Sequence, residues 1–290
     1  MRILLTGGSG FLARYLFPHL SLDGGEVLRS DVKAPHGSGI VQCDFSESNE
    51  VERLIREFSP DQIYHLAGTF TNDYMIDWRA NYQGTKNLLD AVHLYSKATR
   101  VLLVGSAAEY GHIQESDCPI PEDHPLRPAS IYGLTKAMQT MLMHYCCSSW
   151  KMNVVMARLF NLIGRGISER LFIGTIFAQL ESVCAGKAST IAVGNLESRR
   201  DYLSGEKAAN GMELVMKRGT AGQTYNVASG FSRRLYDVLV EILEEKGLGM
   251  DIVRVGAGNR GNTYDPKDIY ADITKLKALE RASEEQTAGS

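Results

Sequence analysis

Short apolar runs alternate with longer amphipathic stretches over the first hundred residues of the chain. The apolar runs have the length of buried strands, and the amphipathic stretches repeat their apolar residues with the period of a surface helix. Predicted strands are 3–6, 26–29, 62–67 and 101–105, and predicted helices are 11–20, 51–58 and 80–95. Because strands that alternate with helices form a parallel sheet covered on both faces, the pattern predicts a doubly wound α/β fold.

The organisation changes after the proline-rich segment 111–128, which is a predicted loop. Beyond Asn161 the strand and helix alternation weakens, as it does where a second, smaller unit begins. The predicted units are a main domain over 1–165, a smaller C-terminal α+β lobe over 166–280 interleaved with the last strands of the main sheet, and a disordered polar tail over 281–290.

A glycine turn follows the first predicted strand directly. Residues 7–13 read GGSGFLA and open the first helix, which is the G-x-x-G-x-x-A spacing of a dinucleotide-binding turn. Glycines let the backbone approach a pyrophosphate, and the helix N-terminus offers free N–H groups. We therefore predict a Rossmann-type domain that holds a nicotinamide dinucleotide. The predicted cofactor contacts in this turn are Gly7, Gly10, Phe11 and Leu12.

Two carboxylates near the next strands are candidate cofactor ligands. Asp31 lies close to the end of the second predicted strand, where a carboxylate accepts hydrogen bonds from the adenosine ribose hydroxyls and repels a 2′-phosphate, which favours NAD(H). Arg14, Arg29 and Lys33 are close in sequence and could neutralise that phosphate, so NADP(H) stays open. Asp44 is placed to meet the adenine edge or to cap the following helix.

Tyr132 and Lys136 lie four residues apart in a predicted helix, and this spacing puts both side chains on one face. An ammonium beside a phenol lowers the pKa of the phenol, as a residue that moves a proton during hydride transfer requires. Ser106 follows the strand 101–105, at the end of the sheet where doubly wound folds bind ligands. Its hydroxyl can bond a substrate carbonyl, although a capping serine and an exposed helix face are the structural alternatives.

Composition narrows the class of partner. The 290 residues carry a net charge of −3, without the basic excess that nucleic-acid binding needs. The five cysteines are odd in number and lack metal-ligand spacing, so we expect no disulfide framework and no metal site. We expect no leader segment and no membrane span, and therefore a cytoplasmic protein.

Together these motifs resemble the extended short-chain dehydrogenase/reductase family, also called the NAD-dependent epimerase/dehydratase family. The resemblance implies that Ser106, Tyr132 and Lys136 form the family's catalytic triad, with Tyr132 and Lys136 also contacting the cofactor. It further implies that Asn81 braces the active site on the cofactor side and that Asn161 reaches toward the substrate. The segment that it implies lines the cofactor is Leu66, Ala67 and Gly68.

The resemblance also implies a nucleotide-diphosphate sugar as the substrate. Arg200 and Arg260 match arginines that meet the nucleotide and the diphosphate, and guanidinium suits phosphate because its fork donates two hydrogen bonds. The segment from Ser106 through Ala107 and Glu109 is most similar to that of GDP-4-keto-6-deoxy-mannose reductases, which makes these three residues substrate-side candidates. A structural carboxylate is the other interpretation of Glu109.

Three functions remain open at this point. The favoured one is reduction of the 4-keto group of a nucleotide-linked 4-keto-6-deoxy sugar, with a 4-epimerase that retains NAD as the alternative and a non-catalytic nucleotide-binding regulator behind it. A 4,6-dehydratase is disfavoured because Ala107 and Ala108 stand where that subfamily has an Asp-Glu pair. The resemblance also implies a homodimer, joined through a four-helix bundle built from the helices over 80–95 and 137–150.

Overall fold

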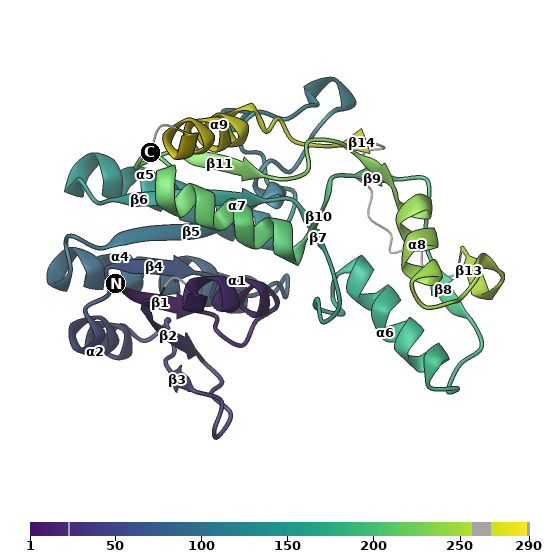
Figure 1. The fold of residues 1–290 in the computed structure, drawn as a ribbon, viewed down its shortest axis with the longest axis horizontal. Helices are drawn as coiled ribbons and strands as arrows, with labels where there is room; N and C mark the ends of the chain where they lie inside the picture. The colour runs from purple at the N-terminus through teal and green to yellow at the C-terminus, as the bar shows by residue number, and fades with distance from the viewer. Residues whose placement is uncertain (23, 257–267, 289–290) are drawn as a thin grey trace.

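The computed structural model describes residues 1–22, 24–256 and 268–288. Seven parallel strands form the main sheet in the order β11-β6-β5-β4-β1-β2-β3 (Figure 1). The strand order reverses between β1 and β4, which creates a crevice at the carboxyl ends of these two strands. The predicted doubly wound fold is confirmed. Its strands are β1 (Arg2–Thr6), β2 (Glu26–Asp31), β3 (Ile40–Gln42), β4 (Gln62–His65), β5 (Arg100–Ser106), β6 (Val154–Leu159) and β11 (Thr224–Val227).

Helices cover both faces of this sheet. The helices of one face are α1 (Phe11–Leu22), α7 (Gly205–Arg218) and α9 (Thr274–Ala288), and those of the other are α2 (Ser48–Phe58), α4 (Gly84–Tyr95) and α5 (Ile131–Trp150). Apolar side chains of the strands pack against each set, so two hydrophobic cores sandwich the sheet. Because α7 and α9 contribute to the first core, much of the chain after residue 204 belongs to the main sheet rather than to the lobe.

A smaller lobe extends from the carboxyl end of the sheet (Figure 1). Its own core joins α6 (Phe172–Cys184) and α8 (Leu235–Glu244) to the parallel pair β8 (Ile191–Val193) and β13 (Val253–Val255). A three-stranded sheet completes it, formed by β12 (Arg233–Arg234), β9 (Arg199–Arg200) and β14 (Asp268–Ile269). The pair β7 (Asn161–Ile163) and β10 (Tyr202–Ser204) lies between the lobe and the main sheet.

Two predicted elements differ in the structure. The helix predicted over 80–95 consists of the end of a π-helical turn, η1 (Trp78–Gln83), and of α4, and a short helix α3 (Tyr74–Asp77) precedes them. Helix α9 continues to Ala288, into the segment 281–290 for which a disordered tail was predicted. A polar sequence hides this helix because it offers only a few apolar positions to the sheet.

No helix within the described ranges has the length and the apolar character needed to cross a lipid bilayer. On α5 the exposed fraction of Met141 is 68%, and Leu134 and Tyr145 are also exposed, whereas Met143 is fully buried in the core. The homodimer through α4 and α5 stays a prediction.

Candidate active site

The glycine turn joins β1 to α1 at the sheet crevice. Gly7 has a φ of +65°, and a Cβ placed on it would stand 2.8 Å from the backbone nitrogen of Ala67. The Gly10 N–H donates to the Gly7 carbonyl at 2.9 Å, and α1 begins at the next residue, Phe11, with Leu12 following. Glycine therefore lets this turn pack closely against the loop after β4, and the first turn of α1 leaves backbone N–H groups without partners inside the helix, an arrangement that fits a pyrophosphate.

Asp31 lies beside this turn, as predicted. Its Oδ2 atom accepts hydrogen bonds from the backbone nitrogen of Ser9 at 3.0 Å and from the Ser9 hydroxyl at 2.7 Å. Of the neighbouring cations, Arg29 is engaged elsewhere: its guanidinium covers the Phe17 ring and Nη2 donates to the Ser38 carbonyl at 2.6 Å. The Asp31 carboxylate therefore stays next to the glycine turn, while the other two cations of the prediction, Arg14 and Lys33, are both exposed.

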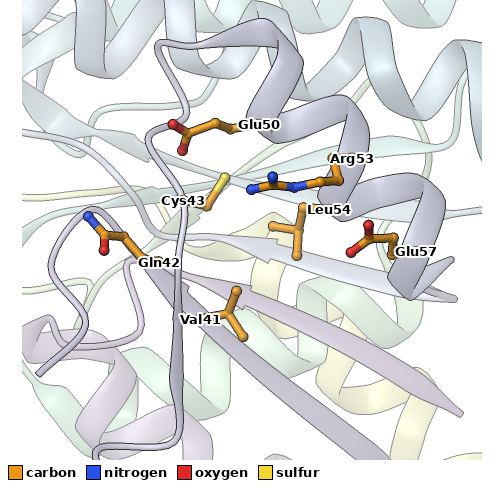
Figure 2. Close-up of a pocket in the computed structure, with 7 residues that line it drawn as sticks. All are labelled: Val41, Gln42, Cys43, Glu50, Arg53, Leu54 and Glu57. Atoms are coloured by element: carbon orange, nitrogen blue, oxygen red, sulfur yellow. The ribbon is translucent and has the colours of Figure 1, made fainter. Parts of the chain in front are cut away.

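Asp44 does not cap helix α2, whose N-cap is Glu47. Its Oδ1 atom instead accepts the Ser46 N–H at 2.9 Å in a local turn, while its own N–H donates to Glu50 Oε2 at 2.8 Å. A pocket of about 290 Å³ lies next to this turn, between β3 and α2 (Figure 2). It is lined by Val41, Gln42, Cys43, Glu50, Arg53, Leu54 and Glu57. None of the predicted catalytic side chains is among them.

The three predicted catalytic residues converge at the carboxyl end of β5. Ser106 ends this strand and is half-buried, and its hydroxyl also accepts the Ala108 N–H at 3.2 Å. Tyr132 lies in the first turn of α5, which Ser130 caps by accepting the Gly133 N–H, and its phenol shares a hydrogen bond with the Ser106 hydroxyl. Lys136 follows one turn later and is 5% exposed.

The predicted fall in the pKa of Tyr132 is wrong for this structure. Burial raises the pKa of the phenol to about 12, and the hydrogen bond with Ser106 only partly opposes this rise. The Lys136 ammonium donates to the Val104 carbonyl at 2.9 Å and to Gln139 Oε1 at 3.1 Å. Burial also lowers the pKa of Lys136 to about 8. Loss of solvent therefore outweighs the effect of the neighbouring ammonium that the spacing suggested.

The loop after β4 connects the glycine turn to the catalytic residues. Leu66 and Ala67 border Gly7, and a Cβ on Gly68 would stand 2.7 Å from Asn81 Oδ1 and 3.6 Å from Lys136 Nζ. Asn81 is fully buried; its Oδ1 accepts the Thr69 N–H at 2.8 Å and its Nδ2 donates to Thr135 Oγ1 at 2.9 Å. Asn81 therefore connects the loop after β4 to helix α5, which is the way in which it could brace the active site as predicted.

A second residue that holds this loop was not predicted. Asp77 is fully buried, and its carboxylate accepts from the hydroxyls of Thr69 and Thr71 and from the backbone nitrogens of Thr71 and Asn72. The loop then places the Phe70 ring edge-on to Tyr132, with ring centroids 5.0 Å apart. A lone aspartate before an aromatic residue carries no sequence signal for this role.

Glu109 lies behind the catalytic residues and does not face a substrate. It is fully buried; Oε1 accepts the Ser106 N–H at 2.7 Å, and Oε2 accepts from Arg158 Nη2 at 2.8 Å and from Thr140 Oγ1 at 2.6 Å. Arg158 is 1% exposed and also donates to the Tyr110 hydroxyl at 2.9 Å. The substrate-side prediction for Glu109 is therefore wrong, and the structural interpretation is right.

A family model now matches what the geometry suggests. The model described as the NAD dependent epimerase/dehydratase family covers residues 3–228. The chain belongs to this family. Membership confirms the predicted class of cofactor, a nicotinamide dinucleotide.

Relatives of this epimerase/dehydratase chain include sugar-nucleotide enzymes. It is 28% identical over 254 residues to GDP-6-deoxy-D-mannose reductase of Pseudomonas aeruginosa, covering 84% of this chain and 79% of that protein. It is 26% identical over 264 residues to dTDP-6-deoxy-L-talose 4-dehydrogenase (NAD(P)(+)) of Kitasatospora kifunensis, covering 88% and 82%. Its fold matches UDP-glucose 4-epimerase of Thermus thermophilus in complex with NAD with a TM-score of 0.84 at 24% identity, covering 97% of this chain and 93% of that chain.

The substrate-side candidates of this family member are more scattered. Ala107 adjoins Ser106 in the turn η2 (Ala107–Glu109), and Asn161 begins β7 with an exposed side chain whose Nδ2 donates to the Asp201 carbonyl at 3.2 Å. Arg200 is on β9 in the lobe, where Nη1 donates to the Arg199 carbonyl at 2.7 Å. Arg260 falls outside the described residues. No group of three or more histidine, cysteine or acidic side chains suited to a metal ion occurs within the described part of the chain.

Proposed function

We propose that this protein is an NAD(P)-dependent oxidoreductase that reduces the 4-keto group of a nucleotide-linked 4-keto-6-deoxy sugar. The observation that carries the proposal is the continuity of the site. The glycine turn, the loop at Gly68 and the side chain of Lys136 are in contact, and Ser106 and Tyr132 share a hydrogen bond beside them. A cofactor seated on the turn would therefore lie next to an acid and a hydrogen-bond donor.

Each catalytic side chain has one task in this proposal. A reduced nicotinamide, when bound, supplies the hydride. Tyr132 donates its phenolic proton to the oxygen that develops negative charge at C4, and a pKa of about 12 keeps that proton in place until it is needed. The Ser106 hydroxyl donates to the same oxygen and holds the carbonyl. Lys136, with one N–H left after its bonds to Val104 and Gln139, supports the phenol and the cofactor ribose.

The choice of sugar rests on the relatives and on two small side chains. Two of the curated relatives are named for a GDP-6-deoxy-D-mannose and a dTDP-6-deoxy-L-talose reaction, and both involve 6-deoxy sugars. Ala107 and Ala108 leave the substrate side of η2 without the acid and base that loss of water across C5 and C6 needs. Reduction and epimerisation at C4 need neither, and both therefore remain compatible with this site.

Asp31 supports NAD(H) as the preferred cofactor. Its carboxylate stays at the end of β2 beside the glycine turn, where it would accept the ribose hydroxyls and repel a phosphate. The exposed Arg14 in the first turns of α1 leaves use of NADP(H) open.

A substrate panel tests the proposal directly. The protein is incubated with GDP-, dTDP-, UDP- and CDP-linked 4-keto-6-deoxy sugars and with NADH or NADPH, and nicotinamide absorbance is followed. Stoichiometric oxidation with one of the sugars is the expected result. Interconversion of a C4 epimer pair without net oxidation would assign the protein to the 4-epimerases instead.

Tyr132→Phe is the matched variant for this assay. It removes one hydroxyl and keeps the ring that packs against Phe70, so we expect a loss of at least about 100-fold in turnover with little change in NADH affinity. Affinity is measured by fluorescence titration of NADH. Equal losses of turnover and of affinity would show that the hydroxyl holds the cofactor rather than acting as the acid.

A further inference from the structure

A chain of buried hydrogen bonds runs beneath the proposed site, from Lys136 to the end of β1. Lys136 Nζ donates to Gln139 Oε1 at 3.1 Å, and Gln139 Nε2 donates to Thr85 Oγ1 at 2.7 Å. The His65 ring lies between two hydroxyls, with Nε2 3.1 Å from Thr85 Oγ1 and Nδ1 2.9 Å from Thr6 Oγ1. None of these five side chains is more than 5% exposed, so water does not compete for these bonds.

The direction of the bonds around Thr85 follows from its single hydroxyl hydrogen. Thr85 Oγ1 donates that hydrogen to the backbone carbonyl of Asn81 at 2.6 Å. Its two lone pairs can therefore only accept, one from the Gln139 amide and the other from an N–H on His65 Nε2. The Gln139 amide nitrogen is thereby committed to Thr85, and the Gln139 oxygen must point at Lys136.

The state of His65 is consistent with these directions. Burial, and secondly the charge of Lys136, lower the pKa of His65 to about 3, so the ring is neutral and carries one proton. With that proton on Nε2, the Nδ1 atom accepts from the Thr6 hydroxyl. Thr6 Oγ1 in turn accepts the Ala67 N–H at 3.1 Å, in the loop that borders the glycine turn. Donors and acceptors alternate along the whole chain.

We propose that Gln139 is a positioning residue that holds the Lys136 ammonium in place and helps it to retain its proton, with the Gln139 amide oriented by Thr85 and His65. A flipped amide would bring its NH₂ group against the ammonium and would leave Thr85 Oγ1 with His65 as its donor and without the second bond from Gln139. The kinetic consequence rests on the proposed function, but the arrangement itself does not.

Other groups near Lys136 also influence its pKa. Glu109, from η2, favours the charged ammonium, and burial disfavours it more strongly. His65, from β4, is neutral and adds no charge of its own, and Tyr132, on the same helix, stays protonated because burial raises its pKa to about 12. The Gln139 oxygen accepts a hydrogen bond from the ammonium, and a substitution can remove this acceptor without adding or removing a charge.

The test is an NMR titration of the full chain with ¹³C at the lysine ε-carbons, without substrate or cofactor. The Lys136 signal is assigned as the one missing from Lys136→Arg. Gln139→Met keeps the length of the side chain and removes the acceptor, so the midpoint of the Lys136 titration should fall from about 8 by roughly one pH unit. Gln139→Glu adds a negative charge at the same position, so the midpoint should rise above the wild-type value.

Two further variants separate orientation from packing. Thr85→Val keeps the shape of the side chain and breaks the chain behind Gln139, so the midpoint should fall by less than it does in Gln139→Met. Gln83→Met makes the same chemical change at a half-buried position where the amide bonds Asn87, and it should leave the midpoint unchanged. A midpoint that moves in the same direction in Gln139→Met and Gln139→Glu, or in neither, overturns the proposal.

The readout needs no turnover, so it stays valid whether or not the reductase proposal holds. If Gln139→Met does not fold, the opposite shifts expected of Gln139→Glu and Thr85→Val still decide the question. A protein that shows these shifts but reduces no 4-keto sugar would retain the positioning role and lose the proposed function.

Discussion

Replacing Glu109 by glutamine should destabilise the protein more than any surface charge change. The carboxylate accepts four hydrogen bonds: one from the Ser106 N–H, one from the Thr140 hydroxyl, and two from Nε and Nη2 of Arg158. Glutamine offers one oxygen to these donors and turns an NH₂ group toward the others. Arg158, at 1% exposure, is then left as a buried charge without its counter-ion.

The magnitude follows from that burial. Removing one partner of a buried ion pair costs about 3–5 kcal/mol, because the remaining charge cannot recover its hydration. Urea unfolding followed by circular dichroism measures the loss, provided that the slope with urea concentration is unchanged. The matched control is Glu26→Gln, whose partner Arg2 is on the surface, and this change should cost less than about 1 kcal/mol.

A double variant distinguishes the buried charge from simple loss of packing. Glu109→Gln combined with Arg158→Met removes both charges, and it should be less destabilised than Glu109→Gln alone. A Glu109→Gln protein within about 1 kcal/mol of wild type, or a double variant that is worse than the single one, would refute the argument that Arg158 depends on this carboxylate.

Two further predictions concern the cofactor and pH. Asp31→Ser should weaken NADH binding by about 10- to 100-fold, because hydrogen bonds to a charged group contribute about that much to affinity. NADPH binding should weaken less. Equal losses of NADH and NADPH affinity in fluorescence titrations would contradict the proposed contact between Asp31 and the ribose. The single-turnover rate of reduction should fall as pH rises through about 8, because Lys136 loses its proton there while Tyr132, with a pKa of about 12, keeps its own. Stopped-flow measurement from pH 6 to 10 checks this, and a rate that rises over that range would count against the assignment of Lys136.

The sheet and the catalytic positions could be predicted because each leaves a local mark in the sequence. Buried parallel strands need continuous apolar runs, a dinucleotide turn needs glycines, and a tyrosine and a lysine that share a helix face must be about one turn apart. Asp31 and Ser106 were found because each lies just beyond the end of a predicted strand. These marks depend on residues that are neighbours along the chain.

The parts that could not be predicted depend on burial and on distant contacts. Asp77 holds the loop of Phe70 through backbone N–H groups, and Gln139 looks like any polar residue of a helix surface until α5 is packed against the sheet. The error in the pKa of Tyr132 has the same origin. Spacing indicates which groups are close, whereas the pKa is dominated by the loss of water around them, and only the folded chain sets that loss.

Helix α5 shows why the site is built from polar contacts rather than apolar ones. Its buried face carries Thr135, Lys136, Gln139 and Thr140, which bond to Asn81, Val104, Thr85 and Glu109 on other elements. An apolar face tolerates small rotations of a helix because apolar contacts have no direction, whereas each hydrogen bond is lost when its angle changes. A helix held by several such bonds has one position and one rotation that satisfy all of them. The orientation of Tyr132 toward Ser106 is therefore a consequence of how α5 is bonded on its far side, and this explains why residues remote from the phenol should affect its chemistry.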